Sequence, residues 1–312
     1  MSTVSAIIVN WNGKHLLAEC LDSLRMQSRA VDEILVVDNG STDESQTMIR
    51  ERYPEVTLIE LGENKGFSVA NNIGIRRAKG DYIALLNNDL LLDQEWMTCM
   101  TDALDADPSL GSCASKMLFY DRRDIIDSAG ISVLKHGTGI NRGHFERDGA
   151  PFQRATKVFG ACAGAAVYQA AMFCDIGVFD EDFYIYFEDV DLSFRAQLAG
   201  YDCLYVPQAV VYHHYGASSN SFGLGKKYYY LARNGLLVIV KNMPAPLLWR
   251  YLPFIVAVPL SKAIYGAVTR QVGLYIRACL DDLRVLPRML RKRYVIQQAA
   301  RRSAKDIDAL LT

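Results

Sequence analysis

The stretch Ile83–Leu92, with the sequence IALLNNDLLL, places three polar residues between two apolar runs. The residues from Tyr82 to Leu86 are apolar over a length typical of a buried strand, and leucines follow the polar triplet. Asn and Asp bond their own nearby backbone in turns, so the triplet taken alone favours a turn. Alternatively, a buried strand that ends in two amides and a carboxylate, with apolar residues on both sides, holds these polar groups in a fixed position, as a binding site requires. The flanking sequence helps to decide between a turn and a site.

Strand and helix patterns alternate through the part of the chain that leads to this stretch. Three short runs predict strands, at Ala6–Asn10, Glu33–Val37 and Val56–Leu61. Helices are predicted between them by apolar residues at helical spacing from Leu17, by a capping-box pattern at Ser41 and by an apolar face from Phe67. Repeated strand–helix units predict an α/β fold, with a mostly parallel sheet flanked by helices.

Polar residues stand at or just beyond the ends of these predicted strands: Asn10, Asp38, Asn64 and the triplet Asn87–Asp89. Ligands of such sheets bind outside the carboxyl ends of the strands, so one small-molecule site explains the pattern better than four separate turns. No GxGxxG follows the first strand and no GxxxxGK[ST] occurs, which weakens dinucleotide and P-loop interpretations. Carboxylate and amide oxygens are ligands that Mg²⁺ or Mn²⁺ prefers.

Length and composition limit the class of protein. The chain has 312 residues, 50% of them hydrophobic, and a formal net charge of −1, so it can bury a large core in one large or two small domains. Its 7 cysteines show no CxxC spacing, which argues against a disulfide framework or structural zinc and favours a reducing cytoplasm. The apolar run Ala6–Val9 is too short for a signal peptide and has no basic region before it.

Acidic and aromatic residues are concentrated from Phe179 to Pro207. On a helix Glu188 and Asp191 share a face, and Asp191 is spaced to pair with Arg195. Asp189 has no partner at helical spacing, so it is the carboxylate that most needs an explanation.

Histidines and glycines add further candidates. The predicted strand Val210–His213 ends in His213 and His214, each of which is either a satisfied core residue or, near carboxylates, a metal ligand or proton carrier. His144 stands in a Gly-rich loop and is expected to be solvated. The run Gly160–Ala166 is almost without side chains, which suits either close approach to a ligand or tight internal packing.

With these residues in view, the chain resembles family 2 inverting glycosyltransferases of the GT-A fold, and bacterial rhamnosyltransferase-like members in particular. The resemblance covers roughly residues 4–242 and depends on six motifs in order: IIVNWNG, VVDNGSTD, NKGFSVANNIG, LLNNDLLL, FYIYFEDVDLSFR and VVYHHYGAS. It implies a nucleotide-binding half at residues 1–98 and an acceptor and catalytic half at 99–242.

The resemblance implies how the donor and metal are bound. Asp38 matches the carboxylate that reads the base of a nucleotide-sugar, with Asn10 and Asn64 in the same pocket. The triplet of Asn87, Asn88 and Asp89 replaces the family's DxD motif. Because its first position is Asn, Asp89 alone would give the Mg²⁺ or Mn²⁺ ion a carboxylate, and Asn87 and Asn88 would contact the nucleotide.

The resemblance also implies a catalytic base. Asp189 matches the second residue of the family's Glu–Asp pair, which removes the acceptor proton, and Glu188 is its neighbour in that pair. His213 matches the histidine that completes the metal site, with His214 as the rival. Gly160–Ala165 would line the sugar and acceptor pocket. An ionised carboxylate is a suitable base for a single displacement that needs no covalent nucleophile.

The C-terminal region, residues 243–312, differs from the rest of the chain in its distribution of apolar and charged residues. It is strongly apolar from Leu247 to Thr269, yet its longest uncharged run, Tyr251–Ser261, has 11 residues and two prolines, whereas a spanning helix needs ~20. From Arg284 to Lys305 it has eight Lys or Arg residues and no acidic residue. These features predict an amphipathic helical extension on an anionic membrane surface. A transmembrane helix, a packed helical subdomain and a contact between copies of the chain are the alternatives.

Together these features predict an enzyme at the cytoplasmic face of the inner membrane. The resemblance alone implies the donor, dTDP-rhamnose first and a UDP-sugar second. The resemblance and the apolar, basic C-terminal region together imply a lipid-linked saccharide acceptor in surface polysaccharide synthesis. No nucleic acid partner is expected, and a homo-oligomer is compatible with the sequence. A non-catalytic nucleotide-sugar-binding scaffold of the same fold is the rival. A nucleotidyltransferase would usually carry a Gly-rich basic loop where this chain has NWNGK.

Overall fold

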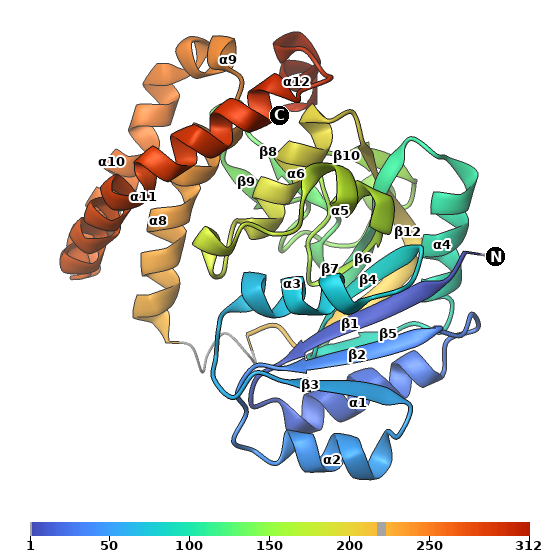
Figure 1. Cartoon of the computed structure of the whole chain (residues 1–312). Helices are drawn as coiled ribbons and strands as arrows, with labels where there is room; N and C mark the ends of the chain where they lie inside the picture. Colours follow the sequence, from blue (N-terminus) through green and yellow to red (C-terminus); the bar gives the residue numbers. More distant parts are fainter. Residues whose placement is uncertain (1, 217–222) are drawn as a thin grey trace.

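The computed structural model describes residues 2–216 and 223–312, and Figure 1 shows a central twisted sheet between helices. Ala217 and Ser218, at the end of the sixth motif, lie outside the described residues. Four parallel strands form one half of the sheet in the order β3-β2-β1-β4. They are β1 (Val4–Asn10), β2 (Glu33–Asp38), β3 (Val56–Glu60) and β4 (Tyr82–Asn87). The predicted strands are therefore present, in the predicted parallel arrangement.

The other half of the sheet is mixed. Strand β11 runs antiparallel to both β4 and β6, and β12 runs parallel to β6. Strands β5 and β10 pair antiparallel with β12, β7 pairs with β6, and β8 and β9 form a separate hairpin. The bounds are β5 (Leu90–Leu92), β6 (Leu110–Phe119), β7 (Arg122–Ser128), β8 (Ile131–Val133), β9 (Gly139–Asn141), β10 (Thr156–Val158), β11 (Ala165–Gln169) and β12 (Asp202–His213).

Helices cover both faces of the sheet because its central strands are buried on both sides. In β1, Ala6 and Ile8 pack toward one face and Ile7 toward the other, as strand alternation requires. The first face is covered by α1 (Lys14–Arg25), α2 (Ser45–Arg52) and α4 (Trp96–Ala106). The second is covered by α3 (Phe67–Arg77), α5 (Ala170–Ile176) and α6 (Glu188–Leu198). This is the predicted α/β class.

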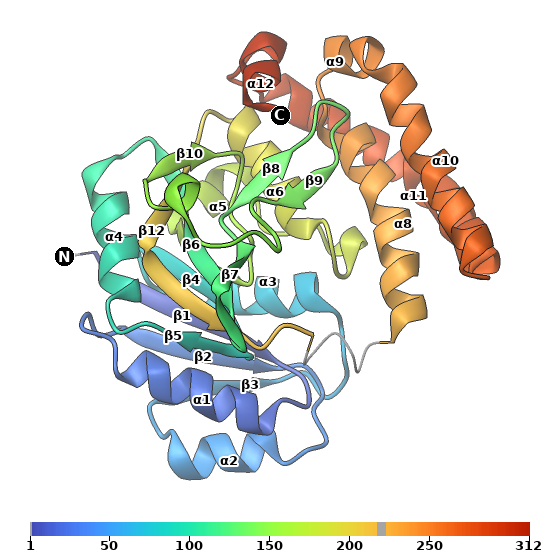
Figure 2. The same ribbon diagram turned by 180° about the vertical axis from the view of Figure 1, so that it is seen from behind.

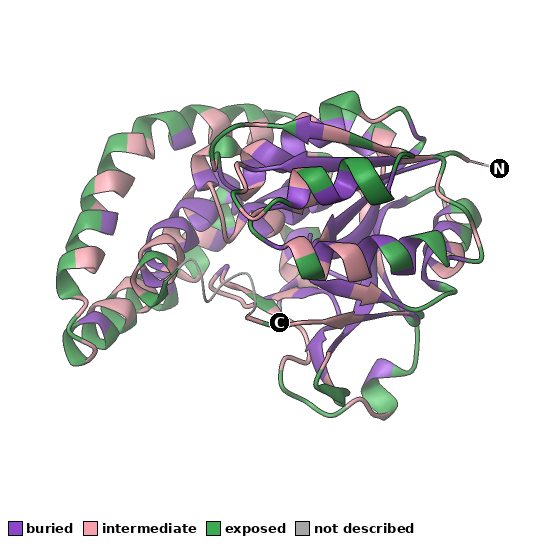
Figure 3. Cartoon of the chain, turned by 90° about the horizontal axis from the view of Figure 1, so that it is seen from below, coloured by how far each residue is buried: buried purple, intermediate pink, exposed green. Residues whose placement is uncertain are grey.

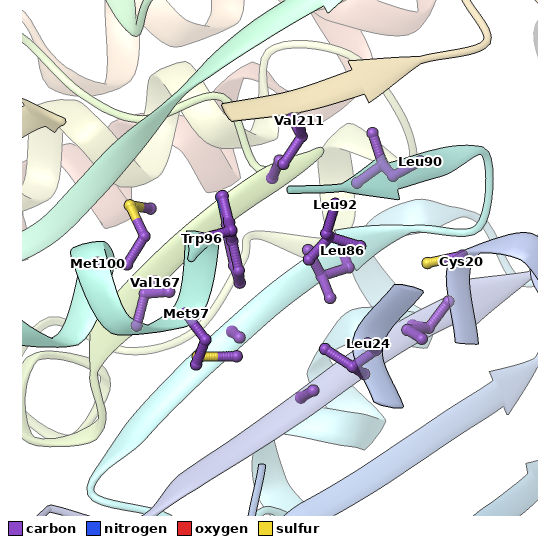
Figure 4. Packing of buried hydrophobic residues seen from close by; sticks show 14 of the residues in the cluster. Cys20, Leu24, Leu86, Leu90, Leu92, Trp96, Met97, Met100, Val167 and Val211 are labelled. Carbon is purple, nitrogen blue, oxygen red and sulfur yellow. The ribbon is translucent and has the colours of Figure 1, made fainter. Parts of the chain in front are cut away.

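The first core holds the strand ends in place. Figure 4 shows Trp96 of α4 beside Leu86 of β4 and Val211 of β12, with Met97 of the same helix nearer to Val167 of β11. The Trp96 indole N–H donates to Ser115 Oγ at 2.8 Å, so this buried aromatic has no unsatisfied polar atom. The apolar residues on both sides of the polar triplet therefore fix where that triplet lies.

The helix starts differ from the predicted capping pattern. Helix α2 begins at Ser45 after Glu44, which has a φ of 64°, and no side chain caps it. The prediction that Ser41 caps this helix is therefore wrong. The Ser41 hydroxyl instead accepts hydrogen bonds from the Asn12 backbone N–H and the Asn10 side-chain amide. Ser41 therefore belongs to the edge of the sheet, and the helix begins only four residues later, at Ser45.

The C-terminal helices pack on α6 and form a third apolar core, above the sheet in Figure 1. Phe194 of α6, Leu237 of α8 and Met289 of α11 are buried in it. The helices are α8 (Leu224–Asn242), α9 (Ala245–Arg250), α10 (Leu252–Val268), α11 (Val272–Gln298) and α12 (Ala304–Leu310). Figure 2, seen from behind, places the β8–β9 hairpin beside α6 and α8.

Helices α10 and α11 form a hairpin whose outer side is apolar, and most of it is exposed or half-buried in Figure 3. Its exposed apolar residues include Phe254, Leu260, Ile264, Ile276 and Leu280. In residues 2–216 and 223–312, no helix combines the length and apolar character needed to cross a membrane.

Most of the C-terminal basic run makes contacts within the chain. Lys292 pairs with Asp180 at 2.5 Å and with Asp182 at 2.7 Å. Six of its eight basic residues contact acidic side chains or backbone carbonyls: Arg284, Arg288, Lys292, Arg293, Arg301 and Arg302. The run therefore helps to attach α11 to α8 and to the segment that holds Asp180 and Asp182.

Candidate active site

A cavity of about 440 Å³ opens at the carboxyl ends of β1, β2 and β4. The β3–α3 loop, the 162–164 segment, the 184–190 segment, the end of β12 and the first turns of α8 complete its wall. Polar residues after β2, β3 and β4 therefore share one cavity with Glu188, Asp189 and His213, whereas His214 is not in the described part of its wall. Residues from opposite ends of the chain become neighbours here.

Asn39 and Asn64 form the polar wall at the β2 and β3 end of the cavity. The Asn39 side-chain amide donates to Asn64 Oδ1 at 3.1 Å, and Asn39 Oδ1 accepts the Lys65 backbone N–H at 2.8 Å. Gly66, with a φ of 88°, brings the backbone against the Tyr184 ring, which would lie 2.5 Å from an added Cβ. Only glycine fits this approach. Asn39 stands in a recognised motif, but the sequence interpretation did not select it.

Asp38 and Asn10 lie behind this wall and are almost fully buried. Asp38 Oδ2 accepts the Gln46 side-chain amide at 2.8 Å and the Ser41 backbone N–H at 3.1 Å, and Oδ1 accepts from the Asn10 amide at 3.4 Å. The described surface of the cavity does not include Asp38 or Asn10. In this structure Asp38 organises the turn after β2, and contact with a base remains a prediction.

The polar triplet faces the cavity, and its three members all line it. Asn87 ends β4, and Asn88 donates to Asn10 Oδ1 at 2.7 Å. Asp89 is buried, and its backbone carbonyl accepts the His214 N–H at 3.0 Å. The triplet is thus tied to β1 on one side and to β12 on the other.

Asp89, His213 and Asp127 form a line of polar side chains at the cavity. His213 Nε2 lies 3.2 Å from Asp89 Oδ1, and His213 Nδ1 lies 2.6 Å from Asp127 Oδ2. Burial would lower the pKa of His213, but its bonds to Asp127 and Asp89 outweigh this and raise it to about 10. A carboxylate behind a histidine orients the other ring nitrogen toward a metal.

These residues fit a divalent metal in donor type. The 3.2 Å separation of His213 Nε2 and Asp89 Oδ1 is that of a hydrogen-bonded ion pair, so His213 would have to release the proton that its raised pKa retains before it could bind a metal. Among the described residues, however, no group of three or more His, Cys, Asp or Glu residues is arranged to hold a metal. Any such ion would therefore have other ligands from outside this set.

His214 and His144 have partners of other kinds. His214 Nε2 lies 2.7 Å from Glu19 Oε2, and its ring stacks on Tyr120. His144 Nδ1 lies 2.8 Å from the Asp127 carbonyl, so the prediction of a solvated loop histidine is wrong. His144 partners Asp127 because the β7 strand and the following loop fold together, which no local spacing encodes. Of the two histidines after β12, His213 is the one beside Asp89.

Glu188 and Asp189 occupy the N-terminus of α6 at the opposite wall. Burial raises the pKa of Asp189 to about 6, against the opposing bonds from the Val190 and Ala163 backbone N–H groups. Burial, followed by the charge of Asp189, raises the pKa of Glu188 well above its ordinary value. Burial therefore raises the pKa of both carboxyl groups, so each holds its proton to a higher pH than an exposed carboxyl would.

Asp191 faces away from the cavity into a buried charge network. Its carboxylate lies 2.9 Å from Arg195 Nε and 2.7 Å from Lys241 Nζ, and it accepts the Asn242 amide at 2.8 Å. The expected Asp191–Arg195 pair is thus present, and it is fully buried rather than exposed. Lys241 also pairs with Asp180 at 2.6 Å. This network fixes α6 against α8.

The Gly-rich segment does both things expected of it. Cys162, Ala163 and Gly164 line the cavity, as predicted for part of the run. Gly160 packs on α6, where an added Cβ would lie 1.8 Å from Ser193 Oγ. The small residues of this run therefore leave the cavity open at residues 162–164 and let the backbone pack closely on α6 at Gly160.

Two important residues were not selected from the sequence. Asp127 follows Ile125 and Ile126 in β7, and a carboxylate next to a buried apolar pair is a signal that was available. Asn234, on α8, contacts the 183–186 segment some 50 residues earlier in the chain. No spacing in the sequence indicates this contact.

The sheet topology and the polar strand ends define a GT-A type α/β fold. A mannosyltransferase from Pyrobaculum calidifontis, solved with GDP-Man and Mn²⁺, shares this fold with a TM-score of 0.58 at 18% identity, over 96% of this chain and 86% of that one. Staphylococcus aureus TarS, solved with UDP, aligns over 99% of this chain and 89% of that one, with a TM-score of 0.53 at 18% identity. At these identities the likeness concerns the fold alone.

The family model "Glycosyl transferase family 2" matches residues 5–177, and the chain belongs to that family. An N-acetylglucosaminyl-diphospho-decaprenol L-rhamnosyltransferase from Mycobacterium tuberculosis is 27% identical over 229 residues, 65% of this chain and 72% of that protein. An uncharacterised protein of Sinorhizobium fredii, y4gI, is 30% identical over 202 residues, 60% of this chain. The chain spans only 21% of y4gI.

Proposed function

We propose that this protein is a metal-dependent, inverting glycosyltransferase. The observation that carries the proposal is that Asp189 and the Asp89–His213 pair lie in the wall of one cavity at the sheet edge. One group is a base with a pKa near neutrality, and the others are donors suited to a divalent ion. A nucleotide-sugar between them would meet the groups needed for transfer to a second sugar.

Asp189 would be the catalytic base. A hydroxyl of the acceptor would form a bond to the anomeric carbon of the donor while the bond from that carbon to the diphosphate oxygen breaks. The hydroxyl proton would pass to the ionised Asp189, and the diphosphate would leave with the electron pair. Burial and the charge of Asp189 disfavour the ionised form of Glu188, so Asp189 is the member of the pair to which we assign the role of base.

Asp89 and His213 would hold the metal, with Asp127 orienting His213. A bound divalent cation supplies charge stabilisation for the departing nucleoside diphosphate. The nucleotide would contact the asparagines that line the cavity, namely Asn39, Asn64, Asn87 and Asn88. Asp38 and Asn10, which bond each other, would support them from behind.

The donor we propose is dTDP-rhamnose, with a UDP-sugar second, and the acceptor a lipid-linked saccharide. Support comes from the Mycobacterium tuberculosis relative, which is named as a rhamnosyltransferase acting on N-acetylglucosaminyl-diphospho-decaprenol. A lipid-linked acceptor also suits the exposed apolar side of α10 and α11, which would lie against the lipid surface at the cytoplasmic face of the inner membrane.

A thermal stabilisation screen tests the donor. The protein would be heated with dTDP-rhamnose, UDP-sugars and GDP-mannose, each with and without Mn²⁺. One nucleotide-sugar should raise the melting temperature more with Mn²⁺ than without it. Hydrolysis of that donor should then depend on Mn²⁺ and fail in Asp189→Asn. If no donor stabilises the protein, the proposal fails.

A non-catalytic nucleotide-sugar-binding scaffold is the second candidate. It would give the same stabilisation but no metal-dependent hydrolysis. The raised pKa of Asp189 at the cavity wall favours the enzyme, since a simple binding site has no need of a carboxyl group held near its titration point.

A further inference from the structure

The segment 183–187, directly before Glu188 and Asp189, has a backbone that is unfavourable for its residues. Tyr184, Tyr186 and Phe187 have φ values of 60°, 67° and 71°, in a region that large side chains rarely adopt. Tyr184 has a ψ of −61°, and the Ile185 N–H donates to the Phe183 carbonyl at 2.6 Å, so this is a γ-turn of the strained kind. Such a segment persists only where its surroundings hold it.

One side chain, that of Asn234, bonds three backbone carbonyls of this segment. The Asn234 side-chain amide lies 2.8 Å from the Phe183 carbonyl, 2.9 Å from the Ile185 carbonyl and 2.8 Å from the Tyr186 carbonyl. Asn234 is fully buried in α8, so water does not replace these bonds.

Asn234 is itself fixed in orientation. Arg233 Nη1 donates to Asn234 Oδ1 at 2.9 Å and to the Asp182 carbonyl at 2.7 Å. The oxygen of the Asn234 amide therefore faces Arg233 and its nitrogen faces the carbonyls. The segment is also attached to the nucleotide-binding half, since the Tyr184 hydroxyl donates to Asn64 Oδ1 at 3.2 Å.

We propose that Asn234 is a positioning residue for catalysis: by holding the carbonyls of residues 183, 185 and 186, it sets where α6 begins and so where Asp189 enters the cavity. The inference rests on the proposed role of Asp189 as the base. A shift of one residue's backbone before Glu188 would rotate the first turn of α6, because α6 starts directly after the left-handed Phe187. Asn234 does not line the cavity, so it acts through the backbone.

The environment of Asp189 gives this role a measurable consequence. The titratable groups that interact with its carboxylate are Glu188 on α6 and, from β11 and the segment before it, Tyr168 and Cys162. Burial raises the pKa of all three and so disfavours the charged form of each. Water that enters a loosened segment would therefore act mainly on the burial of Asp189 and lower its pKa.

The test is Asn234→Ala, with Asn242→Ala as the matched control. Asn242 is an equally buried asparagine on the same helix, and its amide contacts Asp191 and the Val238 carbonyl instead of the 183–186 carbonyls. Hydrogen exchange is measured on peptides covering residues 183–190, together with the pH profile of Mn²⁺-dependent dTDP-rhamnose hydrolysis. Asn234→Ser, which keeps one donor, is made in parallel in case the alanine variant does not fold.

We expect Asn234→Ala to speed exchange at least 10-fold in 183–190 and to lower kcat at least 10-fold, with a smaller change in KM. The acid limb of its profile should move below that of wild type, and Asn242→Ala should lower the melting temperature without moving the limb. Wild-type exchange in 183–190, or an unmoved limb with unchanged kcat, would overturn the proposal. If wild type hydrolyses no nucleotide-sugar, the proposed function fails, and hydrogen exchange still decides whether Asn234 holds the segment.

Discussion

Asp189 and Asp191 are two residues apart on α6, yet they face opposite environments. Asp189 meets the cavity and the backbone N–H of Ala163, whereas Asp191 meets Lys241 and Arg195. The pKa of Asp189 is raised by burial, while the cations beside Asp191 outweigh its burial and lower its pKa. This difference separates a base from a structural carboxylate.

Replacing Asp189 by Asn should remove the base and keep the shape. We expect kcat to fall by about 10²–10⁴-fold, the usual contribution of a general base, with donor affinity nearly unchanged. In wild type the rate should fall as the pH drops below about 6, because the raised pKa leaves Asp189 protonated there. The pH profile measures both effects, and a variant that keeps the acid limb would show that another group is the base.

Replacing Asp191 by Asn should act on stability. An exposed pair would contribute up to ~1 kcal/mol, but this pair is buried. Removing one partner of a buried ion pair typically costs ~3–5 kcal/mol, so a large drop in melting temperature is expected. Calorimetric unfolding of both variants compares them. A stable Asp191→Asn that binds donor and fails in transfer would place the base two residues later.

Asp89→Ala should abolish the effect of Mn²⁺ on donor affinity, because Asp89 is the only carboxylate of the polar triplet. Asp127→Asn should weaken the metal effect about 10–100-fold, since it acts through the orientation of His213. Isothermal calorimetry with donor, with and without Mn²⁺, orders the variants. Equal metal-assisted affinity in Asp89→Ala and wild type would refute the metal assignment.

At the scale of elements, the turn between β2 and α2 is built around Asp38. Its carboxylate bonds Ser41, Gln46 and Asn10, so the turn keeps its shape without a ligand. Asp38→Ala should weaken free nucleoside diphosphate and donor alike. It should also destabilise the fold by ~1–3 kcal/mol, because buried donors lose their acceptor.

Glu60→Ala is the control for Asp38→Ala. Glu60, on β3, lies in register with Asp38 of the neighbouring strand β2, but unlike Asp38 it is exposed. It should leave nucleotide affinity unchanged when dTDP and UDP are titrated. If Asp38→Ala lowers the melting temperature and leaves both affinities intact, Asp38 has only the structural role.

At the scale of the whole molecule, the α10–α11 hairpin has residues that pack in the core and other residues that are exposed. Its inner side contributes Ile255 and Met289 to the core shared with α6 and α8, while its outer side exposes apolar residues. Deleting residues 247–312 would therefore uncover Phe194 and Leu237, and loss of membrane binding could not be separated from loss of folding. Point substitutions on the outer side avoid this.

The triple variant Phe254→Ser, Ile264→Ser and Leu280→Ser should release the protein from vesicles with little effect on its melting temperature. Met26→Ser, at a position 67% exposed on the far side of the sheet, is the control. Most residues of the basic run pair with acidic residues of the same chain, so they are not available to bind anionic lipid. Salt screens exposed charges over ~8 Å at physiological ionic strength, so it would weaken a purely electrostatic attachment. We therefore expect binding to anionic vesicles to survive high salt. Vesicle flotation measures both. Release by salt alone would show that the basic residues carry the binding.

The sequence by itself determined the α/β class, the parallel strands and the edge at which polar side chains gather, because strand periodicity and the position of a residue at a strand end are local properties. It also indicated Asp89, Asp189 and His213 as candidate site residues, since each belongs to a recognisable motif. Only the tertiary structure decided which of these residues meet. Asp127 lies 86 residues before His213, and Asn234 lies 51 residues after Phe183. Such contacts depend on how distant strands and helices pack, and the resulting burial and partners shift the pKa values of Asp189 and Asp191 in opposite directions.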